Sequence, residues 1–219
     1  MVKDLTNDLA HIRALLFDLG GVVFRIDFGR AISIWAERAS CDPADLRTRF
    51  AFDGAYEDHE RGDLDESAYF GVLRTSLGVA LSDADLRAGW NNIYMDPVSG
   101  MAPILGTARS RYPLYAFTNS NPTHQRVWSV RYASGLAVFR AVFVSSEIGL
   151  RKPDPEAFRA VANRAGFDPS AFLFFDDSVE NVEGARTAGM SAVLVESPTD
   201  VQRSLQRFGV ETQGEIVET

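Results

Sequence analysis

The chain has 219 residues, of which 46% are hydrophobic, and it carries a formal net charge of -8 with a pI of about 4.9. A chain of this length and composition can bury a sizeable core, as one α/β domain or as a core with an insertion. The acidic balance argues against nucleic acid and anionic membrane surfaces as partners, since both need a basic face.

One cysteine, Cys41, excludes an internal disulfide, and no apolar run approaches the ~20 residues of a membrane-spanning helix. No basic and apolar leader pattern opens the sequence. We therefore expect a cytoplasmic protein, and its oligomeric state cannot be read from the sequence.

The first predicted strand is the apolar run ALLF at residues 14–17, which stops at Asp18 and is followed by Gly20 and Gly21. From residue 28 to residue 98 the spacing becomes helical, with no strand-like run. Apolar residues recur at i, i+3, i+4 and i+7 after Phe28, and a second helix is predicted with Ser82 as its N-cap. The sequence therefore predicts an all-helical insertion after the first strand.

After residue 101 the pattern alternates between strand and helix. Strands are predicted at residues 112–117, 141–144, 171–175 and 192–195, with a final helix near 199–208. Alternation with short connections predicts an α/β fold with a doubly wound, Rossmann-like parallel sheet. The predicted core domain comprises residues 1–25 and 99–219, and the predicted cap domain comprises residues 26–98.

Polar side chains follow the predicted strands where each one ends. Asp18 ends the first strand, Thr118 and Asn119 follow the second, and the pair Asp176 and Asp177 follows the fourth. Ligands of an open parallel sheet bind at the carboxyl ends of its strands, so these groups should converge on one edge.

Three carboxylates in one place disfavour joint ionisation unless a cation is bound, and an all-oxygen ligand set suits Mg²⁺. Lys152, beyond the third strand, supplies a point charge for a phosphoryl group, and Thr118 and Asn119 can donate hydrogen bonds to its oxygens. Asp18 is then the best-placed nucleophile. The Gly20 carbonyl is a further candidate metal ligand, because a residue without a side chain lets the backbone approach closely.

Each of these residues also has a purely structural interpretation. Asp18 can be a turn residue, Asp177 or Ser178 can cap a helix, and Lys152 can be a solvated loop lysine. Capping does not explain why the acids and the lysine converge, and this convergence favours a site.

The motifs FDLGG, FTNSN, RKPDP and FFDDSVEN resemble, in this order, the four motifs of the haloacid dehalogenase-like (HAD) hydrolase superfamily. The resemblance covers nearly the whole chain and implies a Mg²⁺-dependent phosphatase acting on a small phosphorylated metabolite. It implies an Asp18 nucleophile, Thr118 and Lys152 in catalysis and phosphate binding, Asp177 as the direct metal ligand and Asp176 as the supporting one. Within the superfamily, the motifs look closest to a branch of sugar-phosphate phosphatases that includes an α-glucose-1-phosphate phosphatase.

One position departs from the family pattern. Typical phosphatases of the family have a second aspartate two residues after the nucleophile, which protonates the leaving alkoxide, and this chain has Gly20 there. Either another group supplies the proton, or the leaving group is good, or turnover is slow. His59, in the sequence DHERG of the predicted cap, is the candidate replacement acid/base, although a packed or surface histidine is the commoner reading.

Two alternatives to a phosphatase follow from this departure. A metal-free haloacid-type dehalogenase also lacks the second aspartate, but it has little use for the pair Asp176 and Asp177. A non-catalytic protein that keeps phosphate or metal binding is the other alternative.

The remaining expectations concern single residues. Glu60 and Arg61 are candidates for substrate specificity, and His124 is expected to face solvent. Trp35 and Trp90 are expected in the cap core, where both would be buried.

Overall fold

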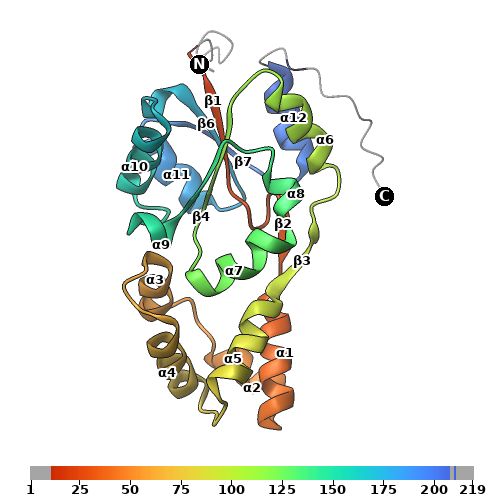
Figure 1. The fold of residues 1–219 in the computed structure, drawn as a ribbon, viewed down its shortest axis with the longest axis vertical. Coiled ribbons are helices and arrows are strands. Elements are labelled where there is room, and N and C mark those ends of the chain that lie inside the picture. The colour runs from red at the N-terminus through yellow and green to blue at the C-terminus, as the bar shows by residue number, and fades with distance from the viewer. Residues whose placement is uncertain (1–10, 208–209, 211–219) are drawn as a thin grey trace, which may run out of the picture.

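The structure, a computed structural model, describes residues 11–207 and residue 210. Its centre is a five-stranded parallel sheet in the order β5-β4-β1-β6-β7 (Figure 1). The strands are β1 (Ala14–Phe17), β4 (Leu114–Thr118), β5 (Ala141–Val144), β6 (Phe172–Asp176) and β7 (Ser191–Leu194). The predicted doubly wound α/β fold is confirmed, and each predicted strand lies within two residues of the observed one.

β1 is the central strand, and its residues are fully buried. In the register of the sheet, Phe17 stands beside Ala116 of β4 and Phe175 of β6. The backbone N–H of Asp18 donates to the Phe175 carbonyl at 2.8 Å. Asp18 is therefore held at the carboxyl end of the sheet, between the ends of its two neighbouring strands.

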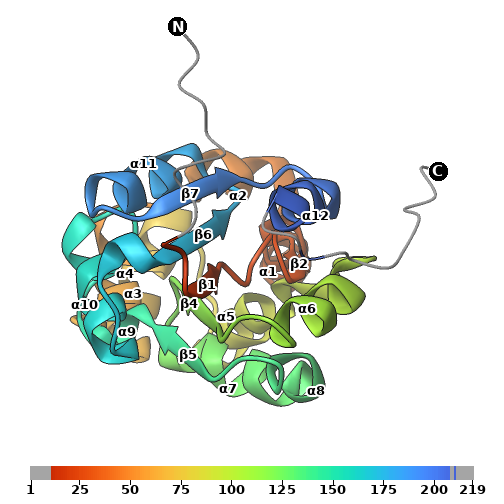
Figure 2. The same ribbon diagram turned by 90° about the horizontal axis from the view of Figure 1, so that it is seen from above.

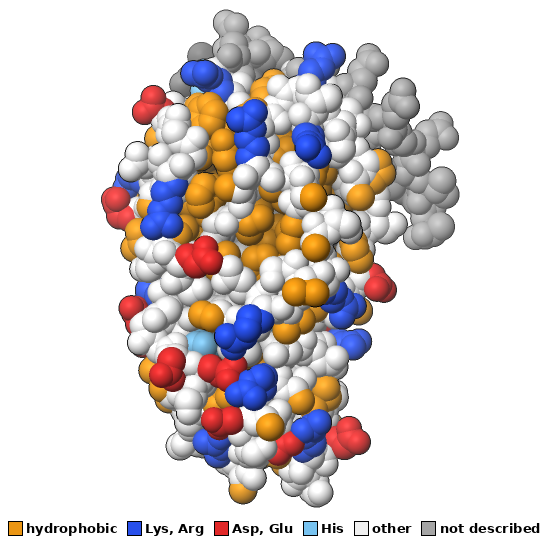
Figure 3. All heavy atoms as spheres, in the orientation of Figure 1, with side chains coloured by type: hydrophobic (Ala, Val, Ile, Leu, Met, Phe, Trp, Pro, Cys, Tyr) orange, Lys and Arg blue, Asp and Glu red, His pale blue; other side chains and the backbone are white. Residues whose placement is uncertain are grey.

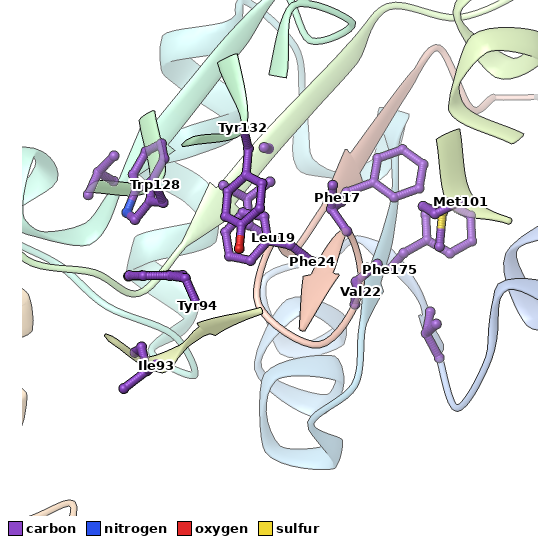
Figure 4. Packing of buried hydrophobic residues seen from close by; sticks show 14 of the residues in the cluster. Phe17, Leu19, Val22, Phe24, Ile93, Tyr94, Met101, Trp128, Tyr132 and Phe175 are labelled. Carbon is purple, nitrogen blue, oxygen red and sulfur yellow. The ribbon is translucent and has the colours of Figure 1, made fainter. Parts of the chain in front are cut away.

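Helices cover both faces of the sheet, with α10 and α11 on one face and α6 and α12 on the other (Figure 2). Two apolar clusters fill the interfaces between sheet and helices, one on each face. Figure 4 shows the first cluster where β1 gives way to the following loop, with Phe17 lying against Phe175. The core helices are α6 (Met101–Arg109), α7 (Pro122–Arg131), α8 (Ala133–Leu136), α9 (Ser145–Ile148), α10 (Pro155–Ala165), α11 (Val179–Thr187) and α12 (Pro198–Arg207), with the short 3-10 helix η2 (Pro169–Ala171).

The helices predicted between residues 28 and 98 form the lower half of the molecule in Figure 1. They are α1 (Phe28–Ala39), α2 (Pro43–Arg49), α3 (Gly54–Arg61), α4 (Glu66–Leu77), α5 (Asp83–Trp90) and the 3-10 helix η1 (Asn91–Ile93). Ser82 is the N-cap of α5, as predicted, in a capping box with Asp85. Trp35 and Trp90 are completely buried and stacked at 6.1 Å between ring centroids, which confirms that they belong to the core of this helical block.

A short antiparallel ribbon joins the helical block to the sheet. It consists of β2 (Phe24–Ile26) and β3 (Tyr94–Pro97). β3 lies between residues 28 and 98, so the prediction that this stretch contains no strand is wrong. Strands of three and four residues are too short to show an apolar alternation. The chain enters and leaves the helical block through this ribbon, and the domain boundaries at residues 26 and 98 stay a prediction.

The tail helix predicted near residues 199–208 is observed as α12, as far as the described residues reach. Residues 1–10, 208–209 and 211–219 of the predicted core domain lie outside the described residues. Within the described part of the chain, no helix has both the length and the apolarity needed to cross a bilayer. On the face of Figure 3, apolar side chains gather over the upper half, whereas acidic and basic side chains intermingle over the helical block.

Candidate active site

A buried lysine joins two aspartates at the carboxyl edge of the sheet. The Nζ of Lys152 donates to Asp18 Oδ1 and to Asp176 Oδ2, each at 2.6 Å. The side chains of Lys152 and Asp176 are 1% and 0% exposed. The convergence of the ends of β1 and β6 with the loop after β5, expected from the sequence, is what the structure shows.

Asp176 has all its lone-pair directions occupied by donors. Asn181 Nδ2 donates to both of its carboxylate oxygens, at 3.0 and 3.1 Å. The Ser178 backbone N–H donates to Oδ1 at 2.9 Å, and Lys152 donates to Oδ2. A carboxylate accepts at about four sites. Asp176 is thus fixed in orientation and has little capacity left for direct coordination of an ion.

Asp177 stands beside this network and is the exposed member of the acidic cluster. One carboxylate oxygen from each of Asp18, Asp176 and Asp177 can be chosen so that all three lie within 4.8 Å of one another. Hard oxygen donors at this separation fit a Mg²⁺ ion, which takes one or two carboxylates and completes its shell with water and phosphate oxygens.

The electrostatics of the cluster favour uptake of a cation. Burial, opposed by Lys152 and reinforced by the charge of Asp176, raises the pKa of Asp18 to about 7. Burial and Asp176 also raise the pKa of Asp177. Burial lowers the pKa of Lys152, but the charges of Asp176 and Asp18 outweigh that effect and the pKa is raised. One lysine does not neutralise three carboxylates, and a divalent ion would make up the difference.

The backbone at Gly21, three residues after Asp18, requires a glycine. Its φ of +85° lies in the left-handed region, and a Cβ built on it would lie 1.9 Å from Asp177 Oδ2. The turn is closed by hydrogen bonds from Gly21 N to the Phe24 carbonyl and from Phe24 N to the Leu19 carbonyl. Neither of these bonds uses the Gly20 carbonyl, which stays a proposed metal ligand.

Thr118 and Asn119 reach the same edge from the end of β4, and both border the cavity described next. The side chain of Asn119, however, is engaged with the loop that carries the lysine. Its Nδ2 donates to the Lys152 carbonyl and its Oδ1 accepts from the Lys152 N–H, both at 2.9 Å. The Asn119 amide thus positions Lys152. A phosphate-binding role for Asn119 stays a proposal, and it would use the backbone N–H.

A cavity of about 370 Å³ opens above these residues, between the sheet edge and the helical block. Asp18, Gly20, Thr118, Lys152 and Asp177 border it on the side of the sheet. Its other walls come from the β2–β3 ribbon, the helical block and α7. The chemistry-bearing residues therefore face an open cavity of ligand size.

The structure does not bring His59 to this cavity, which corrects the expectation of a catalytic role for it. The side chain is 1% exposed, its Nδ1 donates to the Leu64 carbonyl at 2.8 Å, and its ring stacks on Tyr69. Burial lowers its pKa. His59 is a packed histidine of the helical block, and Arg61 nearby pairs with acids of its own helix.

His124 does not face solvent, so that prediction is wrong. It is 4% exposed, lies against the Trp90 ring and borders the cavity. Its Nε2 donates to the Trp90 carbonyl at 3.0 Å, which can only accept, and its Nδ1 accepts from Asn121 Nδ2 at 3.3 Å. Burial lowers its pKa to about 3, so the ring is neutral near neutral pH. The spacing of His124 and Trp128, one turn apart on α7, is the sequence signal of this buried face.

Two residues that matter to the site were not singled out from the sequence. Asn181 holds Asp176, and it stands at the end of the motif FFDDSVEN. Arg151 borders the cavity and pairs with Glu57 and Glu60 of α3, each at 3.0 Å. Glu60, a weak candidate for specificity, borders the cavity as well.

A parallel α/β sheet that gathers three aspartates and a buried lysine at its carboxyl edge, beside a cavity, is typical of a hydrolase whose acidic cluster can hold a metal ion. The chain belongs to the haloacid dehalogenase-like hydrolases, since the model of this family matches residues 12–189. The resemblance read from the four motifs is thereby confirmed.

Several relatives of known activity are phosphatases. A D-ribitol-5-phosphate phosphatase from Bacteroides thetaiotaomicron is 24% identical over 200 residues, which cover 89% of this chain and 97% of the relative. A sesquiterpene phosphatase from Aspergillus oryzae is 25% identical, and the match covers 81% of this chain and 87% of the relative.

Solved structures agree with the fold. A HAD family enzyme from Bacteroides thetaiotaomicron, in complex with magnesium and inorganic phosphate, has a TM-score of 0.72 and 28% identity over 85% of this chain and 95% of its own. An L-2-haloacid dehalogenase has a TM-score of 0.63 at 16% identity, with 89% of this chain and 99% of that chain covered, which shows a shared fold alone.

Proposed function

We propose that the protein is a Mg²⁺-dependent phosphatase that hydrolyses a small phosphorylated metabolite through an aspartyl-phosphate on Asp18. One observation carries the proposal: buried Lys152 links Asp18 to Asp176 at 2.6 Å, with Asp177 beside them, at the edge of a ligand-sized cavity. A purely structural role does not account for three carboxylates and a lysine gathered beside one ligand-sized volume.

Asp18, Asp177 and the Gly20 carbonyl would hold Mg²⁺, with Asp176 as the supporting carboxylate that Asn181 and Lys152 keep in place. When bound, the ion supplies positive charge that keeps the carboxylates ionised and offsets charge on the phosphoryl group. A magnesium and phosphate complex of a solved HAD family structure supports this assignment.

In the proposed phosphoryl transfer, each residue of the site has a separate role. An Asp18 carboxylate oxygen attacks phosphorus, so an Asp18 O–P bond forms as the bond to the leaving alkoxide breaks. Lys152, Thr118 and the Asn119 backbone N–H bind the phosphoryl oxygens. Water then attacks phosphorus, releases inorganic phosphate and regenerates the Asp18 carboxylate.

The leaving alkoxide takes its proton from water in this proposal. Gly20 offers no acid, and His59 lies away from the cavity. His124 borders the cavity, but both of its ring nitrogens are engaged. The reaction should therefore depend strongly on the quality of the leaving group.

Relatives support a small phosphate monoester and leave its organic part open. By its name, one relative acts on D-ribitol 5-phosphate, a polyol ester, and another on a sesquiterpene phosphate, an apolar ester. The sequence suggested a sugar phosphate. The dehalogenase and non-catalytic alternatives are not favoured, because Asp176 of the acidic pair is held in place by hydrogen bonds from Ser178 and Asn181.

The test is a screen of sugar phosphates, nucleotides and acyl phosphates with and without Mg²⁺. We expect phosphate release only with Mg²⁺, and acid-quenched protein should carry a phosphoryl group on Asp18 by mass spectrometry. Asp18→Asn should abolish both signals, while Asp63→Asn, a surface aspartate of the helical block, should keep them. Release that persists in Asp18→Asn, or that ignores Mg²⁺, would refute the proposal.

A further inference from the structure

The walls of the cavity beyond the acidic cluster are mostly apolar. Carbon-only side chains from the ribbon, the helical block and η1 border it: Phe24, Ile26, Phe28, Phe52 and Ile93. Three amphipathic rings also border it: Tyr56, Tyr94 and Trp128. Figure 4 shows Phe24, Ile93, Tyr94 and Trp128 gathered in one group next to the end of β1. A ligand that fills this volume meets aromatic and aliphatic surface on several sides.

Several polar side chains at the cavity are already paired within the protein. Both ring nitrogens of His124 are engaged, and both ends of the Asn119 amide hold the Lys152 backbone. Trp128 Nε1 donates to Ser120 Oγ at 3.0 Å, so the indole turns its polar atom to the protein. A polyol would have to leave hydroxyls unpaired or break these bonds, and either outcome costs binding free energy.

The charged groups in the wall compensate each other. Arg151 Nε donates to Glu60 Oε2 at 3.0 Å, and these side chains are 18% and 5% exposed. Arg151 also contacts Glu57 at 3.0 Å. The pair is a closed internal bridge and offers a hydroxyl-bearing substrate few free donors or acceptors.

Exposed apolar side chains lie on this same wall. Phe52 is 58% exposed and Ile26 is 40% exposed, and both belong to the few large apolar residues that the described surface leaves open. Phe52 forms the edge of an aromatic group, with ring centroids 5.0 Å from Phe28 and 4.9 Å from Tyr56. Apolar surface left in water is stabilised when an apolar ligand covers it.

We propose that the substrate is a phosphate monoester of an apolar alcohol, whose hydrocarbon part lies against Phe24, Phe28, Phe52 and the facing rings. This inference rests on the proposed phosphatase function and names its substrate class. A volume of 370 Å³ has room for roughly a dozen water-sized groups, of which about five go to the phosphate. About seven heavy atoms of the alcohol fit inside, and a longer chain would extend beyond this volume.

Matched pairs of esters test the substrate class. The panel contains n-alkyl phosphates from methyl to nonyl, with glycerol 3-phosphate as the polar counterpart of n-pentyl phosphate and D-ribitol 5-phosphate as that of n-nonyl phosphate. The specificity constant kcat/KM should rise about fourfold per methylene, up to roughly seven carbons. Pentyl phosphate should exceed glycerol 3-phosphate at least tenfold. A flat chain-length series, or a faster polyol ester in either pair, would overturn the inference.

Variants locate the effect on the wall. Phe52→Ser should reduce kcat/KM by a factor that grows with chain length, whereas Val130→Ser, an exposed apolar residue that does not border the cavity, should keep the wild-type slope. A wild-type slope in Phe52→Ser would contradict the assignment. Acetyl phosphate, hydrolysed by the wild type and not by Asp18→Asn, reports the phosphatase function separately. Failure of the inference leaves that signal intact, and failure of the proposed function removes it.

Discussion

An aspartate at position 20 should supply the proton donor that the site lacks. Gly20 borders the cavity two residues after Asp18, and it is not one of the glycines with a positive φ, so its backbone accepts a side chain. A Cβ there would lie 3.1 Å from Ile26 Cδ1 and 3.7 Å from its Cγ1. The obstacle is the flexible end of a side chain that is 40% exposed.

The expected gain can be set against the expected cost. A positioned general acid contributes about 10²–10⁴-fold in rate, which is roughly 3–5 kcal/mol of barrier. Moving Ile26 off its preferred rotamer costs about 0.5–1.5 kcal/mol, and that cost falls on the stability of the fold. The rate gain should appear with alkyl phosphates, whose leaving groups need a proton, and should fade with acyl phosphates, whose leaving groups do not.

The assay is kcat/KM for a series of phosphate esters that differ in the pKa of the leaving group. Gly20→Asp should flatten the dependence, raising the rates of the poorest leaving groups most. Gly20→Asn has the same shape and no proton to give, so it is the matched control. The double variant with Ile26→Val relieves the overlap at Cδ1. If Asp and Asn give the same rates in both backgrounds, the missing acid does not limit turnover.

Three further predictions follow from particular contacts. Gly21→Ala should lower Mg²⁺ affinity in calorimetry at least tenfold, because its Cβ would lie 1.9 Å from Asp177 Oδ2. Gly166→Ala is the control and should keep the affinity, because Gly166 has a similar φ and open space around it. Asn119→Ala should lower the unfolding free energy in urea by about 2 kcal/mol and reduce kcat, because two hydrogen bonds to the Lys152 backbone are lost. The pKa of His124 falls from 6.5 to about 3 on folding, so stability is full above pH 6.5 and is lost as the pH falls toward 3, by about 2 kcal/mol at pH 5. His124→Gln should lack this part of the pH dependence in thermal melts, and an unchanged profile would contradict the assignment.

The sheet and its reactive edge could be predicted because both depend on short-range pattern. Buried parallel strands have apolar runs in the sequence, and here a polar residue marks the end of each run. Once the strands are parallel, the ends of β1, β4 and β6 must meet, whatever the details of packing. The positions of Asp18, Thr118 and Asp176 follow from that geometry alone.

The missed features depend on long-range contacts. Most residues of α7 are polar, which favours a solvent-facing His124. In the structure, however, α7 packs against η1 and buries this ring beside Trp90. The Asn119 amide faces a backbone 33 residues further along the chain, which no local pattern encodes. Which residues of the helical block face the cavity is likewise set by how that block sits on the sheet.

The loop after β5 connects the two halves of the site through adjacent residues. Arg151 points to the helical block, where it pairs with Glu57 and Glu60, while Lys152 points to the sheet and pairs with Asp18. The Asn119 amide fixes the Lys152 backbone to the end of β4 by two hydrogen bonds. A movement of α3 away from the sheet would therefore break the Arg151 ion pairs and leave the lysine in place. Lys152 and α3 are thus held by different neighbours of one short loop.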